Sequence, residues 1–205
     1  MELMRMKWWL LILLAAGMID ASAEPLKYLE LSKSKPVEVN GLEFVAATQS
    51  QWIIHSPEEN ESVEVQLLIT NKSGHDLIFR TFDTFTVQLN NANGTQIRPG
   101  GGRDGTMYSP SVLIPAGDTY CLSRRDELLW DYSTNNSPIT RAFDYWDGTG
   151  SVATFGLHNL GHYTLSFGAF SSQKDSDRES QRLGGLPVWT GTAQTKEVPF
   201  EIIGY

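Results

Sequence analysis

Four histidines, His55, His75, His158 and His162, are the side chains best suited to act as a general base near neutral pH. Nucleophilic hydrolysis needs a nucleophile beside such a base, and a third group that orients the base. None of the four lies in a G-x-S-x-G segment or a comparable nucleophile motif. His158 and His162 have the spacing of one helical face, but their segment indicates a turn between strands, where that spacing has no such meaning. We therefore predict no catalytic residues and no histidine metal site.

Two acidic residues, Asp144 and Asp147, flank Trp146 in an aromatic segment. Calcium prefers about six to eight oxygen ligands, and two carboxylates without a third at regular spacing supply too few. A carboxylate pair for glycoside hydrolysis depends on a distance in space, which spacing along the chain does not give. We predict no metal and no cofactor, and whether the acidic segment binds calcium stays open.

Residues 100–105 form a glycine-rich segment that includes Arg103. Loops that bind phosphate lead from a strand into the N-terminus of a helix, where backbone N–H groups face the anion. This segment leads instead into residues 106–110 and a further strand-like stretch, so we predict an ordinary loop. Its Arg103 is a candidate contact for a partner.

Cys121 is the only cysteine of the chain, so it cannot form an intramolecular disulfide. An exported protein without disulfides is typical of the bacterial envelope or of bacterial secretion. The thiol lies in a strand-like segment, residues 119–122, and we expect it to be buried and inert rather than reactive.

Large aromatic side chains crowd residues 130–146. They either pack in a small core beneath a long connection or form an exposed platform for a peptide or a sugar. On the second interpretation, the partner is contacted by Trp130, Tyr132, Tyr145 and Trp146.

The polar residues 171–189 are predicted to form a long loop. The loops of a β-sandwich gather at its two ends and commonly carry recognition. Arg178, Arg182 and Trp189 are therefore further candidate contacts.

Alternation of apolar and polar residues predicts the strands that position these side chains. Val63, Val65, Leu67 and Ile69 fall on one face of a strand whose other face is polar. The Asn-Gly step at residues 40–41 predicts a tight turn after a short strand. Further strands are predicted over residues 41–47, 77–80, 85–89, 95–97, 111–114, 118–122, 152–157, 163–167 and 195–203.

One short helix is predicted over residues 124–132, where Ser123 could cap it and Asp126 and Glu127 lie near its N-terminus. Short strands with frequent turns and no alternating helices predict an all-β fold. The expected architecture is an antiparallel immunoglobulin-like β-sandwich with long loops and at most one short helix.

A glycine, Gly161, comes two residues before Tyr163, which opens an alternating strand near the end of the chain. This pattern is typical of a tyrosine corner, in which the hydroxyl donates to the backbone a few residues upstream. We expect structural roles for Gly161 and Tyr163.

The first residues have the order of a secretory signal peptide. Arg5 and Lys7 precede an apolar run over residues 8–18, and Ala21 and Ala23 are small residues at the positions that a signal peptidase reads. A run of about 11 residues is short beside the roughly 20 that span a bilayer. We expect cleavage after Ala23, export to the periplasm, the cell surface or the medium, and no stable membrane insertion afterwards.

The predicted domain organisation follows from this start. Residues 1–23 are the signal peptide, residues 24–35 are a leader or an edge strand, and residues 36–205 are the sandwich. The net charge of −8 gives no basic surface for nucleic acid, so we predict no nucleic-acid partner.

The segment 63–74, followed by Phe79 and residues 85–87, resembles the opening of BsuPI-like proteinase-inhibitor domains and of other bacterial immunoglobulin-like modules. The C-terminal part, residues 161–165, 189–191 and 198–202, is similar to the last hairpin of many exported bacterial proteins. The resemblance implies a sandwich fold and, as one alternative function, a protease inhibitor that presents a loop, here residues 171–189.

These observations together predict an exported, non-catalytic binding module. Its partner would be a protein or a polysaccharide in the envelope or outside the cell, and its identity stays open. A BsuPI-like inhibitor and an enzyme of unrecognised type are the alternatives. The oligomeric state is not predicted.

Overall fold

A computed structural model describes residues 30–55, 60–81, 84–100, 111–131, 140–146, 152–157 and 159–204, with the backbone alone at 123–131, 140 and 146. Two compact units divide the chain, Met1–Glu30 and Leu31–Tyr205, and every described helix and strand belongs to the second.

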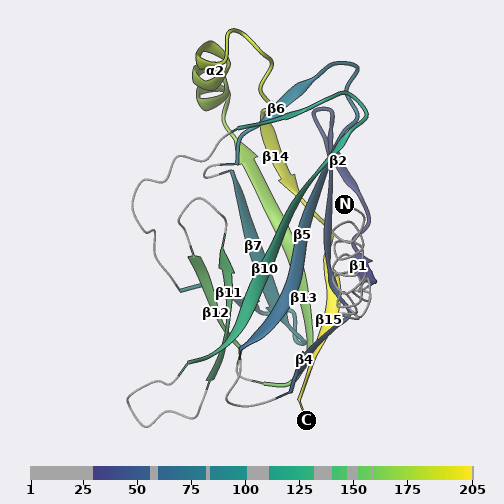
Figure 1. Cartoon of the computed structure of the whole chain (residues 1–205), viewed down its shortest axis with the longest axis vertical. Coiled ribbons are helices and arrows are strands. Elements are labelled where there is room, and N and C mark those ends of the chain that lie inside the picture. Colours follow the sequence, from purple (N-terminus) through teal and green to yellow (C-terminus); the bar gives the residue numbers. More distant parts are fainter. Residues whose placement is uncertain are drawn as a thin grey trace, which may run out of the picture. The chain divides into compact units, whose positions relative to one another are not determined.

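Strands make up most of the described chain, and they form two large sheets and one small one (Figure 1). The first sheet contains β1 (Leu31–Lys33), β2 (Val37–Val39), β3 (Leu42–Gln49), β5 (Glu61–Asn71), β10 (Thr119–Asp131), β11 (Thr140–Trp146) and β12 (Val152–Leu157). The second contains β4 (Gln51–Ile54), β7 (Phe85–Asn91), β8 (Gln96–Ile97), β13 (Gly161–Ser171), β14 (Gly191–Gln194) and β15 (Val198–Gly204). The small sheet pairs β6 (Leu77–Phe79) with β9 (Val112–Ile114), and helix α2 (Gln173–Arg182) lies between β13 and β14 in the chain.

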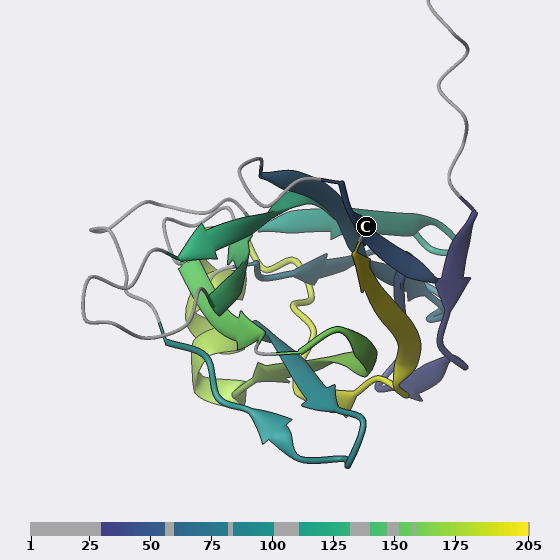
Figure 2. The ribbon, with the colours of Figure 1, turned by 90° about the horizontal axis from the view of Figure 1, so that it is seen from below.

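The two large sheets lie on opposite sides of one apolar interior (Figure 2). The first has the order β1-β3-β5-β10-β11-β12 and the second has the order β4-β15-β13-β7-β8. All described strand pairs are antiparallel except β15 with β4. The predicted all-β sandwich is confirmed, while its immunoglobulin-like assignment stays a prediction.

Strand β5 shows how the sequence pattern sets the core. Val63, Val65, Leu67 and Ile69 are at most 3% exposed, and the intervening residues face outward. Burial of one such side chain stabilises a fold by about 1.5–3 kcal/mol relative to leaving it exposed. The alternation predicted for this strand is confirmed.

The chain passes from one sheet to the other at Ser50, between β3 and β4. Trp52, two residues later, is fully buried. Its ring stacks on Phe200 of the second sheet at 4.0 Å and lies 4.8 Å from Phe143 of the first. Trp52 of β4 therefore contacts aromatic rings of both sheets, which places it at the centre of an aromatic cluster between them.

The turn predicted at Asn40 and Gly41 joins β2 to β3. Both residues have positive φ, 48° and 81°, as a type I′ hairpin turn requires. A Cβ atom on Gly41 would also come within 2.9 Å of the Cβ atom of Ser73. Glycine is therefore needed at this position for both backbone conformation and space.

The predicted tyrosine corner is present. The hydroxyl of Tyr163 donates a 2.7 Å hydrogen bond to the backbone carbonyl of Asn159, and Gly161 between them has a φ of 122°. Only glycine adopts such a φ readily. Two strands, β14 and β15, follow β13, so Tyr163 opens the third strand from the end rather than the penultimate one.

The helix predicted over residues 124–132 is wrong, because residues 124–131 are part of β10, and Tyr132 lies outside the described residues. The strand pairs with β5 from Thr119 opposite Thr70 to Leu128 opposite Glu61, and then with β11. A short apolar run buried in a sheet has no periodicity that separates it from a helix. Pairing with two neighbouring strands decided its conformation.

The prediction that residues 171–189 form one long loop is also wrong, because residues 173–182 form α2. The side chain of Ser172 caps this helix by accepting a hydrogen bond from the backbone N–H of Asp175. Ser176 is the buried residue of the helix. With no apolar stripe, the segment has no helical hydrophobic pattern, although its Ser-x-x-Asp start is a capping signal.

Residues 31–33 belong to the segment 24–35, which was predicted to be either a leader or an edge strand. They form β1, which pairs with β3 from Leu31 opposite Gln49 to Lys33 opposite Ala47. This part of the predicted leader is therefore an edge strand.

Candidate recognition surface

Two of the aromatic residues predicted to contact a partner are core residues. Tyr145 and Trp189 are each 2% exposed. The indole N–H of Trp189 donates to the backbone carbonyl of Val39 at 2.9 Å, and its ring packs edge-on against Phe44. Tyr145 and Trp189 are therefore not contact residues, because buried rings stabilise the sandwich and cannot meet a partner.

The remaining predicted contacts divide into two groups. Arg103, Tyr132 and the side chains of Trp130 and Trp146 lie outside the part of the chain that the structure describes. Arg178 and Arg182 lie on the exposed face of α2.

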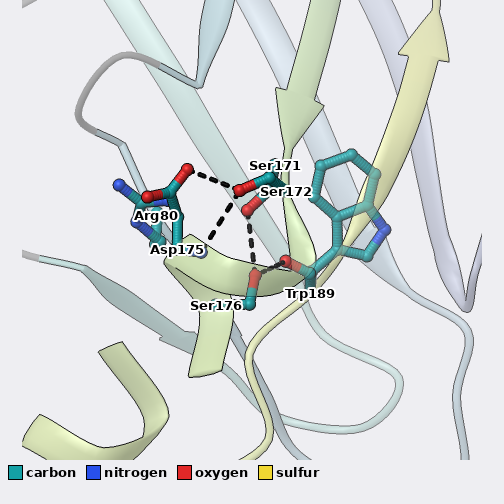
Figure 3. Close-up of polar contacts among 6 residues, drawn as sticks. All are labelled: Arg80, Ser171, Ser172, Asp175, Ser176 and Trp189. Atoms are coloured by element: carbon teal, nitrogen blue, oxygen red, sulfur yellow. Dashed lines mark hydrogen bonds and ion pairs between the residues drawn. The ribbon is translucent and has the colours of Figure 1, made fainter. Parts of the chain in front are cut away.

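Helix α2 is held to the sandwich by its first turn (Figure 3). Ser172 donates to the carboxylate of Asp175 at 2.6 Å, and the guanidinium of Arg80 lies 3.9 Å from that carboxylate. The hydrogen bond from Ser172, helped by Arg80, lowers the pKa of Asp175. Ser176 donates to the backbone carbonyl of Trp189 at 3.0 Å and contacts the hydroxyl of Ser171 at the same distance. These polar groups satisfy one another, so their role is to anchor the helix.

Glu179 supports the far half of the same helix. It accepts hydrogen bonds from the guanidinium of Arg182 at 2.6 and 2.9 Å, and another from the hydroxyl of Ser111. The bonds from Arg182 lower the pKa of Glu179 to about 2, against the opposing effect of its partial burial. Arg182 is thus engaged in a contact within the helix.

The described histidines lie at the surface. His55 Nδ1 is 3.1 Å from a carboxylate oxygen of Glu61, and His162 Nε2 is 4.0 Å from one of Glu201. His162 is 77% exposed and borders an open hollow of about 260 Å³, lined by Ser50, Gln51, His162, Pro199, Phe200 and Glu201. Within the described ranges, no three His, Cys, Asp or Glu residues are grouped to hold a metal ion. His158 and Asp147 lie outside those ranges.

Cys121 is exposed, so the prediction of a buried thiol is wrong. It lies on the outward face of β10, opposite Leu68 of β5. Partial desolvation and the charge of Glu64 raise the pKa of its thiol. Because the thiolate is the reactive form, this environment favours an unreactive thiol.

The outer face of the second sheet presents a continuous set of uncharged polar groups. We call it the neutral face, and it consists of Thr86, Gln88, Asn90, Thr164, Ser166, Gly168, Phe170, Thr192 and Gln194. Of these nine residues, Ser166 is buried, at 3% exposed, and bonds the amide of Gln194. The residues between them in β7, β13 and β14 point into the core. Strand alternation thus places all nine on one side, and Figure 2 shows this sheet at the edge of the molecule.

The polar side chains converge on Gly168 in the middle of β13. A Cβ atom built on Gly168 would lie 3.2 Å from Gln88 Nε2, 3.2 Å from Gln194 Oε1 and 3.3 Å from Thr86 Oγ1. Gln194 also donates to the hydroxyl of Ser166 at 3.1 Å. Two amides and a hydroxyl therefore surround a small notch that exists because residue 168 has no side chain.

Phe170 lies two residues further along β13 and is 57% exposed. Its strand neighbours are Thr192 of β14 and Thr84, whose carbonyl accepts the backbone N–H of Phe170. Its exposed ring therefore lies beside the polar notch on the same face.

Charged groups lie at the border of the neutral face. Glu197 accepts a 2.8 Å hydrogen bond from the amide of Asn90, and His162 and Glu201 lie at the opposite end from Phe170. The outer face of the first sheet differs, because it carries charged groups. Glu64 lies on β5, and the ion pair between Lys72 and Glu43 lies where β5 ends and β3 begins.

The alternation of β13 in the sequence indicates this surface, whereas the clustering of aromatic residues does not. Tyr163, Leu165 and Phe167 define the buried phase of β13, so the opposite phase had to be Thr164, Ser166, Gly168 and Phe170. An aromatic residue in the outward phase of a polar strand was the available clue. Which strands pair with β13, and hence which amides meet at Gly168, depends on long-range register.

No known family model and no curated protein matches the sequence. No helix among the described residues is long and apolar enough to cross a membrane.

Proposed function

We propose that this protein is an exported, non-catalytic binding module that recognises its partner through the neutral face. The observation that carries the proposal is the convergence of Gln88, Gln194 and Thr86 on Gly168, beside the exposed ring of Phe170. Hydrogen-bonding groups held by a sheet are positioned before a ligand arrives, which reduces the entropic cost of binding.

The chemistry of the neutral face suits binding better than catalysis. Amides and hydroxyls donate and accept hydrogen bonds, but they do not exchange protons near neutral pH as a general acid or base must. The nine residues include no histidine, carboxylate or cysteine. The charged pair of His162 and Glu201 lies at the border of the surface.

Export is the second part of the proposal. It is supported by the basic start, the apolar run over residues 8–18 and the Ala21-Ser22-Ala23 exit of the sequence. The partner would accordingly lie in the envelope or outside the cell. The alternative of a protease inhibitor loses the loop assigned to it, because residues 173–182 are helical.

Fractionation of the cells that produce the protein tests this proposal. We expect the wild-type protein to be retained by the envelope or the extracellular matrix, and the variants Gln88→Ala and Phe170→Ala to be released in soluble form. Gln66→Ala is the matched control, because Gln66 occupies an outward position of a central strand in the other sheet.

The proposal fails if the Gln88→Ala and Phe170→Ala variants fractionate as the wild-type protein does. It also fails if the wild-type protein is not retained at all. Circular dichroism of each purified variant establishes that released protein is folded.

A further inference from the structure

We propose, on the premise that the neutral face is the recognition surface, that its occupant is an uncharged polysaccharide. One sugar ring would pack on Phe170, and the hydroxyl groups of the adjoining sugars would bond the side chains around Gly168.

The exposed ring of Phe170 supplies an apolar surface within a polar face. A pyranose ring has a face of C–H groups that packs on an aromatic ring, and burial of the aromatic surface is favourable. The neighbouring side chain, from Thr192, is short, and the ring of Phe170 is 57% exposed, so a ligand on this surface can reach it.

The amides around the notch match the hydrogen-bonding needs of sugar hydroxyls. A hydroxyl group both donates and accepts, and so does a primary amide. The amide of Gln88 and the hydroxyl of Thr86 make no hydrogen bond to another described residue. The amide N–H of Gln194 is engaged by Ser166, which leaves its Oε1 directed toward Gly168.

The notch at Gly168 determines how closely a ligand approaches. Since the three polar atoms lie 3.2–3.3 Å from the position of an absent Cβ atom, a methyl group there would occupy the space between them. The same space can accept one hydroxyl group of a ligand within bonding reach of all three. The three atoms nearest to a methyl group at residue 168 would be the amide ends of Gln88 and Gln194 and the hydroxyl of Thr86, all in side chains. We therefore expect Gly168→Ala to block the notch without disturbing the fold.

The charge and composition of the face favour a sugar over the other candidate, a protein. Protein interfaces are enriched in Tyr, Trp, Met and Arg at their centres, whereas the neutral face has one phenylalanine and otherwise Thr, Ser, Asn, Gln and Gly. The chain has a net charge of −8, with Glu197 and Glu201 beside the face. An acidic polymer would be repelled, while a neutral one meets no charge across the notch.

Affinity electrophoresis of the folded chain, residues 24–205, in gels that contain one polysaccharide each tests the inference. The neutral probes are hydroxyethylcellulose, xyloglucan, galactomannan, mixed-linkage β-glucan and dextran, and the acidic probes are polygalacturonate and hyaluronan. We expect at least one neutral polysaccharide to retard the protein, with little change on addition of salt. Phe170→Ala, Gln88→Ala and Gly168→Ala should each weaken that binding by about tenfold.

The matched controls are Gln66→Ala and Leu113→Ala, which remove an outward amide and an exposed apolar side chain elsewhere. Both should bind as the wild-type protein does, and thermal unfolding should be unchanged in Gly168→Ala. Retardation by acidic probes alone would overturn the inference, as would neutral binding that the three face variants leave intact. Absence of retardation by every neutral probe would also overturn it. In that case, loss of envelope retention in Gln88→Ala would still support the neutral face as the recognition surface, with a different occupant.

Discussion

Tyr163 performs two tasks at the start of β13. Its ring stacks on Phe200 of the adjacent β15 at a centroid distance of 5.7 Å, which places it in the core. Its hydroxyl reaches back to the carbonyl of Asn159 and holds the turn that precedes the strand. One side chain thus fixes both the packing of β13 and the point at which the strand begins.

The change Tyr163→Phe isolates the second task, because it keeps the ring and removes the hydroxyl. We expect it to lower the free energy of unfolding by about 1–2 kcal/mol, since a partly buried carbonyl loses its donor. Tyr120→Phe is the matched control, because Tyr120 is only partly buried, and its effect should stay below about 0.5 kcal/mol. Urea denaturation measures both values. Equal effects of the two changes would show that the bond to Asn159 does not stabilise the corner.

Part of the neutral face could be predicted from the sequence of β13. The phase of a strand identifies outward residues such as Thr164 and Phe170 as soon as its buried residues are recognised. Aromatic character alone does not, because burial is the ordinary state of such rings, and Tyr145 and Trp189 are buried. The meeting of Gln88 with Gln194 could not be predicted, since these residues are brought together only through their separate pairing with β13.

At the scale of elements, β10 was predicted in part as a helix and α2 as a loop, and the two predictions failed for different reasons. Strand β10 contains residues that favour a helix locally, but β5 and β11 each supply a line of backbone partners. Helix α2 is polar throughout its length and is stabilised by contacts at Ser172, Ser176 and Glu179 rather than by an apolar face. Tertiary pairing therefore overrode local propensity in β10, and side-chain hydrogen bonds replaced hydrophobic burial in α2.

The docking of α2 should depend on pH through Glu179. Its folded pKa of about 2 lies below the ordinary value of 4.5. A depressed carboxyl pKa contributes stability that is complete above the unfolded value and is lost as pH falls from 4.5 toward 2. The exposure of Arg182 screens the contact, so we expect Glu179→Gln to cost about 1–2 kcal/mol at neutral pH.

Urea denaturation of the wild-type protein and of Glu179→Gln at a series of pH values measures this contribution. The difference between the two proteins should shrink as the pH falls below 4.5 and nearly vanish near pH 2. Glu43→Gln is the matched control, because the Glu43 ion pair with Lys72 lies at the surface and should contribute at most about 0.5 kcal/mol. A difference for Glu179→Gln that stays constant with pH would show that its carboxylate charge does not hold the helix.

At the scale of the sandwich domain, the two outer faces have different chemistry although both come from antiparallel sheets. The first sheet mixes ion pairs such as Lys72–Glu43 with an exposed cysteine. The second has amides and hydroxyls at its centre and acidic residues at its border. Because the two faces differ in charge, Gln66 on the first sheet gives each proposed binding experiment a control outside the neutral face.

The proposed export of the protein gives the last prediction, which concerns its N-terminus. Because a signal peptidase reads small residues at Ala21 and Ala23, the mature chain should begin at Glu24. The intact mass of protein recovered outside the cytoplasm measures this directly. Ala23→Tyr should block cleavage. Ser22→Tyr alters a position that the peptidase does not read, and residue 22 is removed with the signal peptide, so this variant should give the mature mass of the wild-type protein. Exported protein that retains residues 1–23, or cleavage at the same bond in Ala23→Tyr, would contradict the predicted signal peptide and with it the proposed placement of the neutral face outside the cytoplasm.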